Sequence, residues 1–359
     1  MARGSVPALC LALLWVSLRV HAEPTNAHNA PSPAPGAGIL RHDLRPGPGV
    51  SRLLWLSEYE PSLRFGPGDA RVYILDSGLA GATLLVVGGA HANEIAGTLA
   101  AALVVERAIP TQGRLVVVPN VNSSGSSYVD PSDPQPSWVR MDAASGVRYF
   151  KYGARFVHPE HQGEPDPERF QLPFSAETLD GQESRNLNRA YPGQVDGTLT
   201  QRLAAAIMEL IRREGVDIAV DLHEAAPGSN VAWTIIANPK NLGTAVDAVF
   251  DLDDGGIPMG LDKSSEEFRG LSHREWGDHT AAQAFLVETV NPAQDKAVVE
   301  PVDQLGHPEF PLWRRVAVDL EAISALVRSY NASSRGGILR FGGVPGFAEL
   351  RAAGLEPFF

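Results

Sequence analysis

Residues 84–94 read LLVVGGAHANE. The apolar first half predicts a strand buried on both faces, because it shows no alternation of polar and apolar residues. Two glycines end this strand, and His91 and Glu94 follow three residues apart. A strand that stops at a His-x-x-Glu pair is typical of half a metal site, since both side chains can reach one ion from a single turn.

The segments around this run predict an α/β layered domain. Strands are expected at 71–75, 83–87, 114–118, 217–221, 231–237 and 284–288, and helices at 94–108, 198–213 and 313–326. The succession of strand, helix and strand over 83–118 implies a right-handed crossover onto a parallel sheet. Residues 122–182 lack periodicity, and loops of this length are usually functional, so we expect this segment to pass over the active site.

The N-terminus has the three-part pattern of a secretory signal peptide. A basic residue precedes the apolar run at 6–18, and small residues at Val20 and Ala22 suit cleavage before Glu23. The run is short for a membrane span, although an uncleaved anchor is the alternative. We therefore expect an exported protein, periplasmic or secreted, with a signal peptide at 1–22, a Pro/Ala/Gly-rich linker at 23–50, a catalytic domain at 51–330 and a C-terminal tail at 331–359.

Composition limits the class of protein and the kind of metal site. The formal net charge is −12, which argues against a general nucleic-acid-binding protein. Cys10 is the only cysteine, and it lies in the expected signal peptide. Any metal bound by the mature chain must therefore use His and carboxylate ligands.

A second predicted strand runs into His223. Open α/β sheets bind ligands beyond the carboxyl ends of their strands, so His223 is expected beside the first pair. Two His and one carboxylate are typical ligands of a catalytic zinc ion, and they leave a fourth position open for water. We expect His91, Glu94 and His223 to bind one Zn²⁺ ion, with Asp221 and Glu224 available to orient an imidazole.

Two further motifs add polar groups with a chemical use. Residues 185–193 read RNLNRAYPG, in which Asn188 and Arg189 can present an amide and a guanidinium to a carboxylate. Residues 285–292 read FLVETVNP, in which Glu288 emerges from an apolar strand. Burying a carboxylate there costs stability unless it has a partner or a function. One such function is to take a proton from zinc-activated water.

The remaining His residues are expected to lie away from the metal. For His273 and His279 a surface or loop role is favoured over lining the substrate pocket, since the metal ligands are already complete. His158 and His161 receive the same interpretation.

The order of these motifs resembles the zinc carboxypeptidase superfamily, and more closely its succinylglutamate desuccinylase/aspartoacylase branch. The resemblance covers about residues 83 to 292. It implies an α/β fold of three layers, α/β/α, with a mixed, mostly parallel central sheet. It also implies the roles of six residues: His91, Glu94 and His223 bind zinc, Glu288 is the general base and then the acid, and Asn188 and Arg189 hold the substrate's carboxylate.

The chain departs from this family at one position. Relatives usually carry an additional Arg upstream of the Asn-Arg pair, where it polarises the scissile carbonyl, and at that offset this chain has Gly181. Arg155, Arg169 or Arg185 can take the role.

We therefore expect an exported zinc-dependent hydrolase that cleaves an amide bond of a carboxylate-bearing substrate, similar to the deacylases of this branch. A metallocarboxypeptidase acting on peptides or cell-wall peptides would use the same residues. A further alternative is an inactive carboxylate-binding protein, against which the complete set of ligands and Glu288 argue. The expected partners are a small carboxylate-bearing substrate or a peptide, with no nucleic acid and no stable membrane insertion after signal cleavage.

Overall fold

The computed structural model describes residues 1, 42–267, 269–333 and 336–359. The expected signal peptide with Cys10 and most of the expected linker fall outside these residues, apart from Met1. Among the helices that are described, none combines the length and the apolar character needed to cross a bilayer.

One mixed sheet of eight strands organises the described part of the chain, in the order β1-β2-β5-β3-β10-β13-β11-β12. The strands are β1 (Val50–Trp55), β2 (Arg71–Asp76), β3 (Thr83–Val87), β5 (Arg114–Val118), β10 (Ile218–Ala225), β11 (Thr234–Ala237), β12 (Gly260–Lys263) and β13 (Gln283–Val290). The central four, β5, β3, β10 and β13, are parallel, whereas β2 and β11 run antiparallel to this block. This confirms the expected mixed, mostly parallel sheet.

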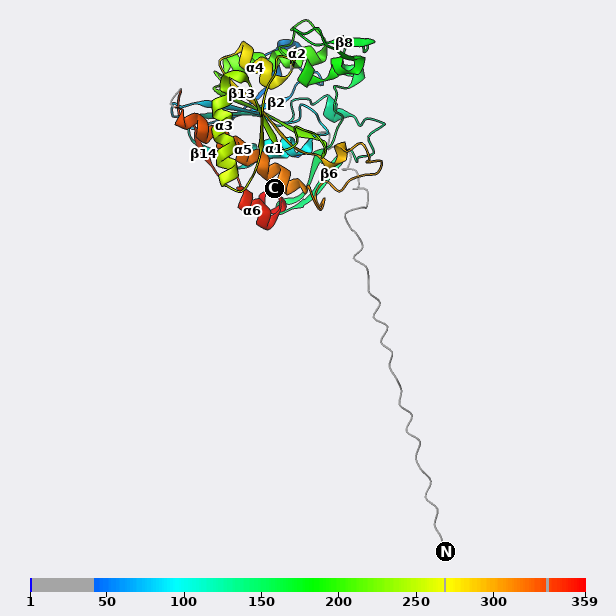
Figure 1. The fold of residues 1–359 in the computed structure, drawn as a ribbon, viewed down its shortest axis with the longest axis vertical. Helices are drawn as coiled ribbons and strands as arrows, with labels where there is room; N and C mark the ends of the chain where they lie inside the picture. Colours follow the sequence, from blue (N-terminus) through cyan, green and yellow to red (C-terminus); the bar gives the residue numbers. More distant parts are fainter. Residues whose placement is uncertain (2–41, 268, 334–335) are drawn as a thin grey trace. The chain divides into compact units, whose positions relative to one another are not determined.

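Helices cover both faces of the sheet (Figure 1). One face carries α1 (Ile95–Arg107), α3 (Leu242–Asp254) and α5 (Leu312–Ala332), and the other carries α2 (Leu199–Arg213) and α4 (Ser272–His279). Each face has its own buried apolar cluster, because alternate side chains of the strands point to opposite sides. The expected three-layer α/β/α architecture is therefore confirmed.

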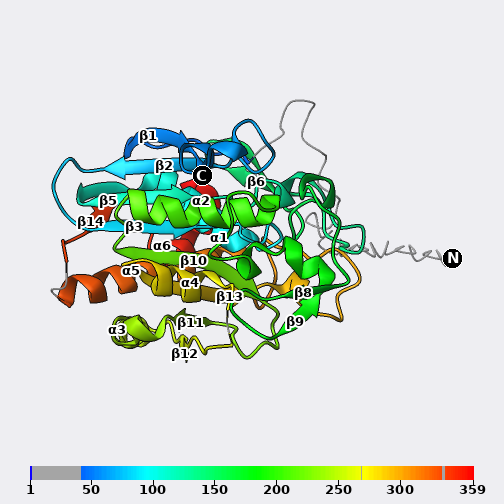
Figure 2. The same ribbon diagram turned by 90° about the horizontal axis from the view of Figure 1, so that it is seen from above.

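Shorter strands and helices lie outside the main sheet and are seen from above in Figure 2. The segment 122–182 contains two hairpins, β6 (Trp138–Ala143) with β7 (Gly146–Lys151) and β8 (Arg169–Gln171) with β9 (Thr178–Asp180). The sequence analysis treated this segment as aperiodic and missed both hairpins. The alternation in β6 and β7 is confined to strands of six residues, and β8 and β9 have three residues each. The C-terminal β14 (Arg340–Gly342) pairs with β4 (Ile109–Gln112), and α6 (Phe347–Ala353) packs on α5.

Two glycines allow α1 to approach the strand ends closely. Gly89 has φ of 69°, a left-handed conformation that glycine adopts without strain, and it turns the chain after β3 toward His91. A Cβ added to Gly97 in α1 would lie 2.7 Å from the Leu222 Cβ in β10. A larger residue at position 97 would therefore push α1 away from the strand that carries His223.

A buried imidazole under the β6–β7 hairpin makes stability depend on pH. The His42 Nδ1 atom accepts a hydrogen bond from the Lys151 N–H at 3.1 Å, and burial lowers the pKa of His42 to about 3. The unfolded chain takes up this proton at an ordinary His pKa of about 6.5, while the folded chain does not. The His42 contribution is therefore present at neutral pH and is lost as pH falls.

We predict that the free energy of unfolding of the wild-type protein falls by about 1 kcal/mol more than that of His42→Asn between about pH 7 and pH 5.5. The Asn side chain can still accept the Lys151 hydrogen bond but has no proton to gain. Urea unfolding followed by circular dichroism at the two pH values measures the difference. Parallel pH dependence in the two proteins would contradict the assignment.

Candidate metal centre and its cleft

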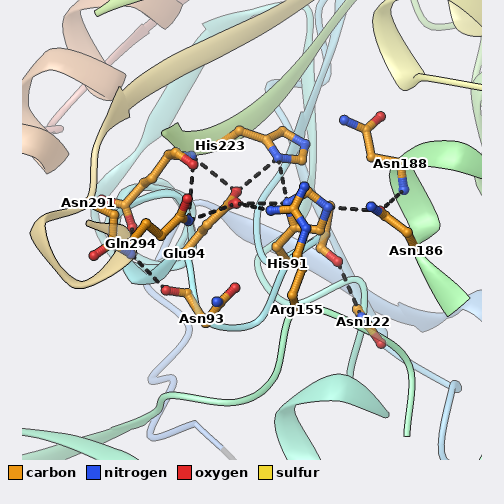
Figure 3. Close-up of polar contacts among 12 residues, drawn as sticks. His91, Asn93, Glu94, Asn122, Arg155, Asn186, Asn188, His223, Asn291 and Gln294 are labelled. Atoms are coloured by element: carbon orange, nitrogen blue, oxygen red, sulfur yellow. Dashed lines mark hydrogen bonds and ion pairs between the residues drawn. The ribbon is translucent and has the colours of Figure 1, made fainter. Parts of the chain in front are cut away.

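Three buried side chains converge where two parallel strands end (Figure 3). His91 and Glu94 follow β3, and His223 lies on the neighbouring β10. The Glu94 carboxylate lies between the rings, with Oε1 2.8 Å from His91 Nδ1 and Oε2 2.9 Å from His223 Nδ1. The candidate ligand atoms of the three residues all lie within 4.8 Å of one another, so the group can hold a metal ion.

The far nitrogen of each ring is held by an oxygen. His91 Nε2 lies 2.9 Å from Asn186 Oδ1, and His223 Nε2 lies 2.9 Å from Asp221 Oδ2. The orientation of the Asn186 amide is set by its neighbours, because its Nδ2 donates to Glu183 and its Oδ1 also accepts from the Asn188 N–H. Both Nε2 atoms therefore carry a hydrogen, and each ring presents Nδ1 to the centre.

This arrangement fits a divalent cation. The two Nδ1 atoms are 3.2 Å apart, and with both Nε2 atoms protonated they face the Glu94 carboxylate as lone-pair donors. Burial lowers the pKa of His223, but Asp221 and Glu94 outweigh it and raise that pKa well above its ordinary value. The electrostatics therefore favour a positive charge between the three side chains, and nitrogen and oxygen donors of this kind suit zinc.

A shell of polar groups fixes the Glu94 carboxylate. Oε1 accepts hydrogen bonds from Arg155 Nη1 and Gln294 Nε2, each at 3.1 Å, and Oε2 accepts from the Glu224 N–H at 3.1 Å. The expected role of Asp221 as a support for an imidazole is confirmed, but that of Glu224 is wrong. The Glu224 carboxylate points away from both rings and instead pairs with the buried Arg315 on α5.

An open cleft of about 370 Å³ leads to these residues. Two guanidinium groups, of Arg155 and Arg189, line the cleft together with the Asn188 side chain. Arg189 donates to the Asn188 carbonyl at 2.7 Å and lies 3.7 Å from the Glu183 carboxylate. The apolar part of the wall comes from β11, β13 and the loops beside them, with Val231, Ile236, Leu271 and Leu286. The cleft thus offers positive charge and apolar surface to one ligand.

Glu288 opens into the same cleft from β13. Its Cα is directly paired with that of His223 in the parallel register of β10 and β13. Its Oε2 has no hydrogen-bond partner among the described residues. Burial raises the pKa of Glu288 to about 8, with His223 opposing the shift. A carboxyl group with a free oxygen and a pKa near neutrality can both accept and release a proton.

The three arginines that the sequence offered for polarising the scissile carbonyl lie in different places in the structure. Arg155 lines the cleft and contacts Glu94. Arg169 lies on the exposed β8–β9 hairpin, where it donates to the Thr178 carbonyl. Arg185 is held by Asp166 at 2.8 Å and by the Val157 carbonyl. Of the three, Arg155 alone lines the cleft.

His273 was expected at the surface or in a loop, and this prediction is wrong. It lies in α4, is fully buried and lines the cleft. Its face of α4 packs against β10 and β13, which the local sequence did not reveal. His279, at the end of the same helix, has a side chain that is 37% exposed and pairs with Glu275.

Several supporting residues escaped the sequence analysis. Asn186 lies inside the motif at 185–193, and Gln294 follows the motif at 285–292 by two residues. Their positions could therefore have identified both as candidate site residues. No sequence pattern pointed to Ser272 or Arg315. The Ser272 N–H donates to Asn188 Oδ1 at 2.8 Å, and Arg315 pairs with Glu224. The Ser272 contact leaves the Asn188 amide nitrogen as the group available to a ligand.

Comparisons with known proteins give similar structures but no sequence match. No protein-family model and no curated protein matches the chain. The chain is similar to a succinylglutamate desuccinylase from Silicibacter sp. TM1040, with 16% identity and a TM-score of 0.43 over 72% of this chain and 60% of that chain. It is also similar to a metallo-carboxypeptidase from Burkholderia cenocepacia, with 11% identity and a TM-score of 0.49 over 80% of this chain and 66% of that one.

A third similar structure is the cell shape determinant protein Csd4 from Helicobacter pylori, with 13% identity and a TM-score of 0.45 over 76% of this chain and 55% of that chain. Both groups that the sequence motifs resemble are thus among the similar structures. The chain spans between 58% and 61% of the length of the desuccinylase and aspartoacylase structures.

The geometry predicts that Asp221→Asn weakens zinc binding about 10- to 100-fold, because Asn cannot stabilise the His223 Nε2–H as the carboxylate does. Asp251→Asn is the matched control, since Asp251 lies in an exposed ion pair with Arg328. Competition with a chromophoric chelator measures both affinities. Equal affinities in the two variants would show that Asp221 does not support the ligand.

Proposed function

We propose that this protein is a zinc-dependent hydrolase that cleaves an amide bond in a substrate carrying a carboxylate. One observation supports this most strongly. Glu288, whose Oε2 has no hydrogen-bond partner among the described residues, is paired in register with His223 and lines the same cleft as His91 and Glu94. A binding protein would not need a carboxyl group that is buried without a partner, because such a group costs stability.

The proposed ligands are His91 and His223 through Nδ1 and the Glu94 carboxylate. When bound, a zinc ion would polarise the substrate carbonyl and lower the pKa of water and of Glu288. Glu288 takes a proton from the attacking water as the C–O bond forms. It then gives this proton to the leaving nitrogen as the C–N bond breaks, so that the products are a carboxylic acid and an amine.

Three side chains are proposed to place the substrate. Arg189 and the Asn188 amide nitrogen bind the carboxylate, since Arg can offer two parallel hydrogen bonds to it. Arg155 is proposed to stabilise the negative charge that develops on the scissile carbonyl. It is chosen over Arg169 and Arg185 because it lines the cleft beside Glu94, while the other two are engaged elsewhere.

The deacylase and carboxypeptidase activities remain two forms of this proposal, because both need the same ligands, base and carboxylate anchor. The signal-peptide pattern at 1–22 supports export, which we propose as the location of the activity. An exported enzyme would meet peptides or cell-wall peptides, whereas the motif details favour N-acyl amino acids.

The test is a panel of N-acyl amino acids and short peptides, each beside its C-terminal amide, with the zinc-loaded protein. We predict that at least one free-carboxylate substrate is hydrolysed and that Glu288→Gln lowers kcat about 10²- to 10⁴-fold while its zinc content is unchanged. The substitution keeps the size of the side chain but removes its ability to accept a proton.

Glu164→Gln serves as the control for this prediction, because Glu164 is exposed on a loop. Full activity in Glu288→Gln would refute the assignment of the base. Absence of turnover across the panel, with zinc bound, would support the inactive carboxylate-binding alternative instead.

A second prediction concerns the carboxylate anchor. Arg189→Met should lower kcat/KM about 100-fold for a free-carboxylate substrate, because a charge-assisted hydrogen-bonded pair is lost. The C-terminal amide of that substrate should be much less affected. Arg169→Met, on the exposed hairpin, should change neither value. An equal loss for acid and amide would mean that Arg189 acts on something other than the carboxylate.

A further inference from the structure

A second cavity lies at the opposite side of β5 from the metal centre. It has a volume of about 300 Å³ and shares no lining residue with the metal cleft. Its walls come from the end of β1, the start of β2, the loop after β5 and the end of β7. This volume is at the lower end of the range for small-molecule sites.

Two cations without carboxylate partners line this cavity. Arg71 and Lys151 take part in no ion pair among the described residues, in a chain whose formal net charge is −12. Both are instead near aromatic rings, with the Arg71 guanidinium 5.6 Å from the Trp55 ring and the Lys151 ammonium 4.8 Å from the Trp138 ring. Half-buried cations of this kind are costly unless an anion meets them.

Three buried polar atoms of the cavity walls have no hydrogen-bond partner among the described residues, and all three can donate. Tyr73 is fully buried, and its hydroxyl has no partner among the described residues, nor has Arg71 Nε. The His42 Nδ1 already accepts from the Lys151 N–H, so its Nε2 carries the hydrogen. These groups call for a ligand that accepts hydrogen bonds.

The one carboxylate that lines the cavity is held by the backbone and forms no ion pair with Arg71 or Lys151 among the described residues. The Asp69 oxygens accept hydrogen bonds from the backbone N–H groups of Ser57 at 2.9 Å and Phe65 at 3.3 Å. Part of the remaining lining is apolar or aromatic, with Leu44, Trp55, Pro67, Ala70 and Pro119. The other part is polar, with Asn120 and three Ser residues whose hydroxyls already donate to protein oxygens. A ligand that fits must therefore combine one anionic group with an apolar body.

We propose that this cavity is a binding site for a small organic carboxylate, with Arg71 and Lys151 meeting the carboxylate and the aromatic wall covering its apolar part. The planar guanidinium of an Arg can donate two parallel hydrogen bonds to the two oxygens of a carboxylate. A free phosphate ion lacks the apolar part that the walls would cover. The site is separate from the metal centre and does not depend on the proposed hydrolase activity.

The test is isothermal titration of the purified protein with 3-phenylpropionate. It is carried out in the Arg189→Met background, so that carboxylate binding in the metal cleft is weakened. We expect saturable binding that is about tenfold weaker in Lys151→Met and in Arg71→Met. The neutral analogue 3-phenylpropanol should bind about tenfold more weakly than the acid, and inorganic phosphate should not displace the acid.

Two further variants control this experiment. Lys263→Met, an exposed cation on β12, should leave the affinity unchanged. Tyr73→Phe keeps the buried ring and should weaken binding a few-fold by removal of the hydroxyl alone. The proposal is overturned if 3-phenylpropionate does not bind, if the acid and the alcohol bind equally, or if Lys151→Met binds as the wild type does.

Discussion

Three buried side chains that all offer lone pairs to one point are the constraint on which the rest of the structure depends. His91, Glu94 and His223 can share this point because Asn186 and Asp221 hold the far nitrogens of the rings. Such a buried cluster favours a positive charge at this point, carried by a metal ion or by a proton on His223. The parallel strands β3 and β10 bring the cluster together, and α1 begins directly after Glu94.

A second layer of buried charge ties this centre to α5. The Glu224 N–H donates to Glu94, and the Glu224 carboxylate pairs with Arg315, whose side chain is fully buried. Arg315 also donates to the carbonyl and the amide oxygen of Gln304. Burial raises the pKa of the nearby Asp319 well above its ordinary value, with the Glu224 carboxylate adding to the shift. Such pairs rarely add net stability, and here the pair fixes the backbone that holds Glu94.

Features that follow from local sequence patterns, such as strand ends, were predicted. Features that depend on packing between distant elements were missed. The apolar run before His91 and the strand before His223 were sufficient to predict two strand ends, and a parallel sheet places such ends together. The sequence alone could not select Arg155, because its position depends on a loop whose residues Gly153 and Ala154 pair with Ala92. The burial of His273 and the pairing of Glu224 with Arg315, 91 residues away, also arise from contacts between elements that no local spacing records.

The cleft combines three residues that can hold a metal ion, the Glu288 carboxyl group and two guanidinium groups. The proposed roles of all of these depend on an ion bound by the first three. Zinc X-ray absorption spectroscopy on the protein loaded with one equivalent of the metal tests that claim most directly. We predict two imidazole nitrogens and carboxylate or water oxygens at about 2.0–2.2 Å, with the imidazole signal lost in a His91→Ala, His223→Ala double variant. A spectrum without imidazole scattering, or one unchanged in the double variant, would contradict it.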